Sequence, residues 1–236
     1  MKLKSFGCSF IFGSDLADAG TQFKYPPPSQ RTWPGIIAKH YNYDYECLAR
    51  PGGGNLQILE NIITQTVDPD PSIYFINWTW VDRFDYWTDQ HTWAYNKFGA
   101  NKWRTTRPGE TDQQSEFYYK NVQHSYSDKF LSLLYARSAI DILNEKQIPF
   151  VMTYMDDLMF ETGFHVSNSI TTLQNMVKPY MTNFEGRTFL DWSRAKGFAE
   201  SAAWHPLEQA HQAAAEYMIS FFDKQKTIDP VLQVHA

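Results

Sequence analysis

Two residues near opposite ends of the chain could together perform nucleophilic catalysis. Ser9 follows Gly7 and Cys8 directly after a short apolar run, where an α/β protein can end a strand and expose a hydroxyl group. His205 lies near the other end, before Pro206 and an alanine-rich helical pattern. A serine hydroxyl needs a neighbouring base to take its proton, and histidine most often has this role. We therefore predict Ser9 as a nucleophile and His205 as its general base.

A run of three glycines could bring main-chain N–H groups close to a ligand. Gly52, Gly53 and Gly54 follow a segment that we expect to be the second strand. Glycine tolerates positive φ angles and lets a ligand approach the backbone. The glycines are contiguous, so they do not form the Gly-x-Gly-x-x-Gly pattern of nucleotide-binding loops. Asn55 comes next, and it either contacts the substrate or caps the following helix; we favour the cap.

These segments resemble the sequence blocks of the SGNH (GDSL-like) hydrolases, a family of α/β/α esterases, lipases and carbohydrate deacetylases. The first block holds the nucleophile, and the chain matches it from Gly7 to Gly13, with Cys8 in place of the family's common aspartate. The second block supplies a glycine N–H to the oxyanion, and Gly52 fits it best. The resemblance implies that the backbone N–H groups of Ser9 and Gly52 bind the oxyanion of an acyl-enzyme reaction.

The third and fourth blocks depart from the family pattern. The family carries Gly-x-Asn-Asp at the end of strand three, whereas this chain reads Asn77-Trp78-Thr79, which places Thr79 at the position of the oxyanion-binding asparagine. The family's last block is Asp-x-x-His, but here Ala202 occupies the aspartate position before His205. Losing one oxyanion donor costs roughly 3–4 kcal/mol of transition-state stabilisation, and a missing acid weakens the histidine as a base.

Several residues could orient the imidazole in place of the missing aspartate. The candidates are Asp191, Glu200, Glu208 or a backbone carbonyl, and the sequence does not choose among them. Asp15 and Asp18 are interpreted as solvated loop residues, and His211 in the final helix as a solvated histidine.

The elements around these residues indicate an α/β fold. Apolar runs and helical patterns alternate along the chain, as is typical of βαβ units and a parallel sheet. We expect one three-layer α/β/α domain over 1–236, flavodoxin-like, with five parallel strands in the order 2-1-3-4-5 and the site at their carboxyl ends. The expected strands are 3–6, 43–48, 73–77, 148–154 and 188–190, and the main expected helices are 32–41, 55–66, 130–143, 170–180 and 207–221.

Residues 82–127 do not follow this alternation, and we expect them to form an insertion after strand three. The segment is rich in aromatic residues and leaves the sheet at the expected site end. Insertions of this length often cover a site or bind a partner. We predict that substrate contacts come from Asn55, Asn77, Trp78, Trp93 and Trp103. In the alternative interpretation, the aromatic side chains of the insertion pack against one another.

The composition argues against several classes of protein. The chain has 236 residues, 43% of them hydrophobic, and a net charge of −5 with scattered Lys and Arg, so we expect no nucleic-acid partner. No segment approaches the roughly 20 apolar residues of a membrane span, and the first apolar run is too short for an export signal. We therefore expect a soluble protein. Because the chain has only two cysteines, Cys8 and Cys47, we expect a reducing, cytoplasmic location. No ligand spacing indicates a metal or another cofactor.

Two functions from different classes follow. The first is hydrolysis of a carboxylic ester, such as a carbohydrate O-acetyl group, through an acyl-Ser9 intermediate, with a small ester or glycan as the ligand. The second is a catalytically inactive SGNH-like scaffold with a structural or glycan-binding role. The motifs Gly-Cys-Ser-Phe, Pro-Gly-Gly-Gly-Asn and Trp-His-Pro also resemble SGNH-like proteins of tailed bacteriophages. That resemblance implies virion proteins as partners and a virion location for the second function.

Overall fold

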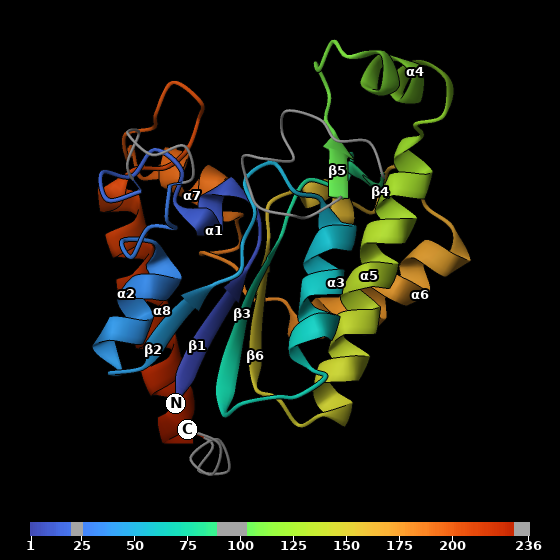
Figure 1. Ribbon diagram of the computed structural model, residues 1–236. Coiled ribbons are helices and arrows are strands. Elements are labelled where there is room, and N and C mark those ends of the chain that lie inside the picture. The colour runs from blue at the N-terminus through green and yellow to red at the C-terminus, as the bar shows by residue number, and fades with distance from the viewer. Residues whose placement is uncertain (20–25, 89–102, 229–236) are drawn as a thin grey trace.

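A four-stranded parallel sheet lies at the centre of the computed structural model, which describes residues 1–19, 26–88 and 103–228 (Figure 1). Its strands are β1 (Lys2–Phe6), β2 (Asp44–Cys47), β3 (Ser72–Trp78) and β6 (Phe150–Tyr154), in the order β2-β1-β3-β6. All neighbours run parallel, and Ser5 is in register with both Cys47 and Phe75. The carboxyl ends of the strands therefore lie along one edge of the sheet.

Helices cover both faces of this sheet and produce three layers (Figure 1). The helices α2 (Trp33–His40) and α8 (Glu208–Ile228) pack together on one face, and α3 (Asn55–Gln65), α5 (Ser125–Glu145) and α6 (Asn168–Val177) cover the other. Phe75 of β3 belongs to the core under α2 and α8, whereas Tyr74 and Ile76 belong to the core under α3 and α5. Burial on both faces explains the nearly continuous apolar run of β3. The expected α/β fold with a parallel sheet is confirmed.

The expected fifth strand at 188–190 is wrong. Thr188 precedes α7 (Phe189–Ala195), and its side chain caps that helix by accepting a hydrogen bond from Asp191 N–H at 3.2 Å. Next to β6, Met181 forms only an isolated parallel bridge with Met152. The described sheet thus keeps the expected order of its first four strands, and a single bridge stands where a fifth strand was expected.

The described elements of the segment 82–127 that precede α5 lie together at the carboxyl edge of the sheet (Figure 1). Strands β4 (Phe84–Trp87) and β5 (Trp103–Thr106) pair antiparallel, and α4 (Gln113–Asn121) follows them. Phe84 stacks on Tyr118 with ring centroids 4.4 Å apart, and Trp87 meets Trp103 edge-on at 5.5 Å. Aromatic side chains of the insertion therefore pack against one another, as the alternative interpretation proposed.

The remaining short elements are α1 (Ser9–Phe12), η2 (Asp157–Met159) and η3 (Lys178–Tyr180). Of the helices in the described ranges, none combines the length and apolar character needed to cross a membrane.

Candidate active site

Ser9 lies in a tight turn that begins where β1 ends. A Cβ atom at Gly7 would lie 2.7 Å from Ile11 Cγ1 and 3.2 Å from the Asn77 carbonyl oxygen, so only glycine fits this turn without displacing its neighbours. Ser9 then starts α1, which Gly13 ends with a φ of 76°. This short helix holds the Ser9 side chain, which is nearly buried, at the carboxyl end of β1.

His205 reaches Ser9 from a loop near the other end of the chain. Ser201 N–H donates to the His205 carbonyl at 2.9 Å, and His205 N–H donates to Ser201 Oγ at 3.2 Å. Trp204 adopts a φ of 61°, a left-handed conformation that costs roughly 1–2 kcal/mol in a non-glycine residue. The imidazole Nε2 lies 2.9 Å from Ser9 Oγ. The two side chains are therefore within hydrogen-bond distance, although 196 positions separate them in the sequence.

Asp15 contacts the other side of the same imidazole. Its Oδ2 lies 2.7 Å from His205 Nδ1 and accepts a second hydrogen bond from Ser201 Oγ, also at 2.7 Å. Because a carboxylate only accepts hydrogen bonds, the neutral imidazole carries its proton on Nδ1, and Nε2 is then the acceptor for the Ser9 hydroxyl. The interpretation of Asp15 as a solvated loop residue was right about its exposure but missed this contact.

The three acids that the sequence analysis offered as replacements make other contacts. Asp191 accepts a hydrogen bond from Thr188, Glu200 forms an ion pair with Arg194, and Glu208 lies near Arg31. Those assignments are wrong, because the acid beside the imidazole follows the nucleophile turn instead of preceding the histidine. The Asp15 backbone has a φ of 71°, a conformation in which Asp is enriched, but no sequence motif links it to His205.

Asp15 is charged at neutral pH. Partial burial acts to raise the pKa of Asp15, but hydrogen bonds from His205 and Ser201 outweigh it and hold this pKa below its ordinary value. A carboxylate in this position can stabilise the imidazolium that forms when His205 accepts a proton.

His211 is a buried histidine close to the site. Its Nδ1 accepts a hydrogen bond from Trp33 N–H at 3.2 Å, and the residue is 1% exposed. Burial and, to a smaller extent, the nearby His205 lower the pKa of His211 to about 3. The prediction that His211 is solvated is wrong: its helix packs this face against α2, so the imidazole is a neutral part of the core.

Asp85 of β4 holds the glycine-rich loop in place. Its carboxylate accepts hydrogen bonds from Gly54 N–H and Gln57 N–H, both at 3.0 Å, and from Gln57 Nε2 and Thr105 Oγ1, both at 2.6 Å. It thus caps α3 from outside the helix. A Cβ atom at Gly54 would lie 2.6 Å from Asp85 Oδ2, which explains the glycine. Burial raises the pKa of Asp85, although these hydrogen bonds act to lower it.

Gly52 lies in the same loop, beside the nucleophile turn. Arg50 N–H donates to the Gly7 carbonyl at 2.9 Å, which ties the loop to the turn that carries Ser9. Gly52 has a φ of 76° and lines the same cavity as Ser9. The structure thus brings these two predicted oxyanion-binding residues to one cavity.

Four other predicted site residues are buried and do not line that cavity: Asn55, Asn77, Trp78 and Thr79. Asn55 Oδ1 accepts from Thr79 N–H at 2.8 Å and its Nδ2 donates to the Thr79 carbonyl at 3.2 Å, so it fastens α3 to the end of β3 and does not cap the helix. Asn77 Nδ2 donates to Thr153 Oγ1 at 2.7 Å, and Trp78 lies in the core. The prediction of substrate contacts for Asn55, Asn77 and Trp78 is contradicted, because β3 continues to Trp78 and α3 covers it.

An open cavity of about 1150 Å³ joins Ser9 and His205 to the insertion. The insertion contributes Tyr86, Trp103 and the loop after β5, and Trp204, which is 70% exposed, lies at the cavity beside His205. Trp103 is therefore placed where a ligand could contact it. Trp93, the other predicted aromatic contact, lies outside the described residues.

Comparison with known proteins identifies the fold. No family model and no curated protein matches the chain. Its structure is similar to that of the psychrotrophic esterase EstA from Pseudoalteromonas sp., inhibited by monoethylphosphonate, with a TM-score of 0.51 and 10% identity over 96% of this chain and 100% of that one. It is also similar to a carbohydrate esterase whose active site is described as having divergent catalytic and non-catalytic binding functions, with a TM-score of 0.50 and 14% identity over 94% of this chain and 68% of that one.

A member of the lipolytic protein G-D-S-L family from Veillonella parvula aligns with a TM-score of 0.49 and 15% identity over 94% of this chain and 98% of that one. Identities this low establish likeness of fold alone. The chain shares the α/β fold of the esterase and the carbohydrate esterase that it matches at 0.51 and 0.50.

Proposed function

We propose that the protein is a serine hydrolase that cleaves carboxylic esters. The observation that carries this proposal is the row of contacts from Ser9 Oγ to His205 Nε2 at 2.9 Å and from His205 Nδ1 to Asp15 Oδ2 at 2.7 Å. A nucleophile, a base and an acid in this order form the arrangement of a catalytic triad. The structural neighbours with the same fold are esterases, which agrees with this reaction class.

In the first half of the reaction, Ser9 Oγ attacks the carbonyl carbon of the ester while its proton moves to His205 Nε2. Asp15 stabilises the resulting imidazolium, which then gives the proton to the departing alcohol. This step leaves an acyl group on Ser9. In the second half, His205 takes a proton from water, the hydroxyl attacks the acyl carbon, and the carboxylic acid departs as Ser9 regains its proton.

The oxyanion needs donors that are fixed before the reaction begins. We assign this role to the backbone N–H groups of Ser9 and Gly52, since both residues line the cavity and no hydrogen bond within the described residues occupies either donor. Thr79 was the predicted third donor, but it is fully buried and does not line the cavity, so we assign it no contact with the oxyanion. Its hydroxyl is buried and has no hydrogen-bond partner in the described part of the chain.

An acetylated carbohydrate is the substrate that we propose. The cavity is open, and the 70% exposed Trp204 lies at it together with Trp103, so a sugar ring in the cavity has a flat apolar side chain to contact. Carbohydrate esterases among the structural neighbours agree with this choice.

The experiment is active-site labelling with a fluorescent fluorophosphonate, followed by hydrolysis of 4-nitrophenyl acetate. The wild type is expected to be labelled and to hydrolyse the ester, whereas Ser9→Ala should do neither and His205→Ala should react much more slowly. Ser14→Ala is the matched control, because Ser14 lines the same cavity without contacting His205. Absence of labelling in the folded wild type would instead favour the inactive scaffold, for which a virion location remains a prediction.

A further inference from the structure

The cavity beside Ser9 collects an unusual share of the arginines of this chain. Four of the eight arginines in the sequence line it: Arg50, Arg83, Arg104 and Arg107. The whole chain carries a net charge of −5, so this cavity gathers positive side chains in a protein that is negative overall. Arginine offers a planar set of donors that matches carboxylate, phosphate and sulfate groups.

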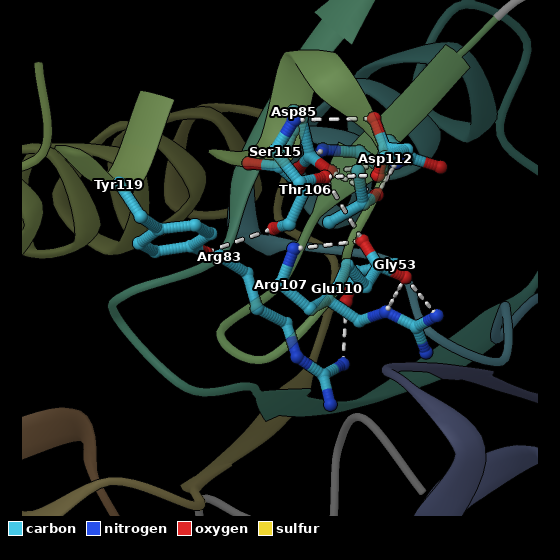
Figure 2. A network of polar contacts seen from close by, with 11 residues as sticks. Gly53, Arg83, Asp85, Thr106, Arg107, Glu110, Asp112, Ser115 and Tyr119 are labelled. Carbon is cyan, nitrogen blue, oxygen red and sulfur yellow. Dashed lines mark hydrogen bonds and ion pairs between the residues drawn. The ribbon is translucent and has the colours of Figure 1, made fainter. Parts of the chain in front are cut away.

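Among the residues that the structure describes, one of these four guanidinium groups is paired with a carboxylate. Arg107 Nε donates to Glu110 Oε1 at 2.8 Å, and Figure 2 shows this pair beside the Arg83 side chain, which extends to the same side of the network. Arg83 Nη1 donates to the neutral Gly53 carbonyl at 2.9 Å, with the guanidinium 4.6 Å from the Trp80 ring centroid. In the described residues, the hydrogen bond of Arg83 thus goes to a neutral acceptor in the loop that carries Gly52.

Arg50 and Arg104 also lack a carboxylate partner among the described residues. Arg50 donates to Gln57 Oε1 at 2.8 Å and to the Trp103 carbonyl at 3.1 Å, both of which are neutral. Arg104 Nη2 is buried and has no hydrogen-bond acceptor in the described ranges. Arg104 nevertheless lines the cavity, and no carboxylate in the described ranges neutralises its guanidinium group, so an anion in the cavity would supply the missing opposite charge.

The acidic residues that line the cavity do not cancel this charge. Glu110 is taken by Arg107, and Asp112 caps α4 by accepting from Gln114 N–H and Ser115 N–H. Burial and, to a smaller extent, the neighbouring Asp156 raise the pKa of Asp82 to about 6. Within the described residues, three arginines of the cavity thus have no carboxylate partner, and Asp82 is the one acidic lining residue without a partner of its own. The buried carboxylate of Asp85, which does not line the cavity, also acts on Arg50.

We propose that the arginines of this cavity bind an anionic group of the substrate, so that the preferred substrate is an ester of an acidic sugar. This inference rests on the proposed function. The bound group is a carboxylate, phosphate or sulfate that accepts hydrogen bonds from Arg104 and Arg83 while the ester carbonyl lies at Ser9.

The test compares acetate esters of methyl glycosides that differ in the group at C6, which is either neutral or anionic. Methyl O-acetyl-glucuronoside carries a carboxylate where methyl O-acetyl-glucoside carries a hydroxymethyl group, and the glucoside 6-sulfate and 6-phosphate separate the three kinds of anion. We expect kcat/KM for at least one anionic ester to exceed that for the neutral ester by about tenfold or more, since hydrogen bonds to charged groups contribute that much. Added salt should reduce the ratio.

Arg104→Gln and Arg83→Gln should each lower the ratio of anionic to neutral kcat/KM about tenfold, and Arg104→Lys should lower it less. Arg137→Gln is the control, because Arg137 lies on α5 outside the cavity and should leave the ratio unchanged. Equal rates for charged and neutral esters, or an equal loss for both in the arginine variants, would overturn the inference while leaving the esterase proposal intact. If the wild type hydrolyses no ester, calorimetric binding of glucuronate and glucose derivatives decides the matter, and equal affinity for both refutes it.

Discussion

Replacing Asp15 by asparagine tests the contact that the sequence pattern did not anticipate. Asp15 Oδ2 accepts hydrogen bonds from both His205 Nδ1 and Ser201 Oγ at 2.7 Å. An asparagine in this place can turn its NH2 group toward Nδ1, which would put the imidazole proton on Nε2, where it blocks acceptance of the Ser9 proton. We expect Asp15→Asn to lower kcat for 4-nitrophenyl acetate and to leave the fold intact.

The size of the loss follows from the exposure of Asp15. A hydrogen bond to a charged group contributes roughly 1.5–3 kcal/mol, whereas loss of a buried triad acid can cost about 10⁴ in rate. The Asp15 side chain is 41% exposed, so water screens its charge and can replace part of the interaction. The lower part of the range, about 1.5–2 kcal/mol, corresponds to a loss of about 10- to 30-fold.

The assay measures kcat and KM for Asp15→Asn, with Asp18→Asn as the matched control. Asp18 is close in sequence but accepts from Ser29 and from Gln30 N–H, so its variant should keep the wild-type rate. Ala202→Asp should not raise kcat when Asp15 is present, because Asp15 already accepts the hydrogen bond from His205 Nδ1. A loss of less than threefold in Asp15→Asn, or a gain in Ala202→Asp alone, would refute the assignment of Asp15 as the orienting acid.

Three further predictions concern residues around the site. Thr79→Val removes a buried, unused hydroxyl outside the cavity with little change in volume, so kcat should stay close to the wild-type value. A fall of about 10²- to 10³-fold would instead show that this hydroxyl binds the oxyanion. Asp85→Asn should lower the free energy of unfolding, measured by urea denaturation, by about 2–4 kcal/mol, because a buried acceptor of four hydrogen bonds then presents an NH2 group to some of those donors. The control is Asp112→Asn at an exposed helix cap, and an equal or larger loss in that control would contradict this prediction. Because the pKa of His211 is lowered in the folded state, His211 becomes protonated in the unfolded state, but not in the folded state, as the pH falls below about 6.5. Stability should therefore drop by about 2 kcal/mol from pH 6.5 to 5, and His211→Asn should lose that part of the dependence while keeping an acceptor for Trp33 N–H.

Local sequence patterns determined the elements that carry the site. The apolar run before Gly7, the glycines at 52–54 and the helical spacing after His205 each act within a few residues, so they could be interpreted from sequence alone. They predicted a parallel sheet and the approach of His205 to Ser9. The expected strand at 188–190 failed because Thr188 is equally suited to start a helix, and packing selected that outcome.

Only the tertiary structure decided which acid, which histidine environment and which aromatic residues belong to the site. Asp15 and His205 lie 190 positions apart, and the loop closed by Ser201 brings them together. The same holds for Asp85, whose carboxylate caps a helix from another element, and for His211, which the packing of α8 on α2 buries. Contacts of this kind depend on how distant segments pack, so they cannot be predicted from the residues next to each partner in the sequence.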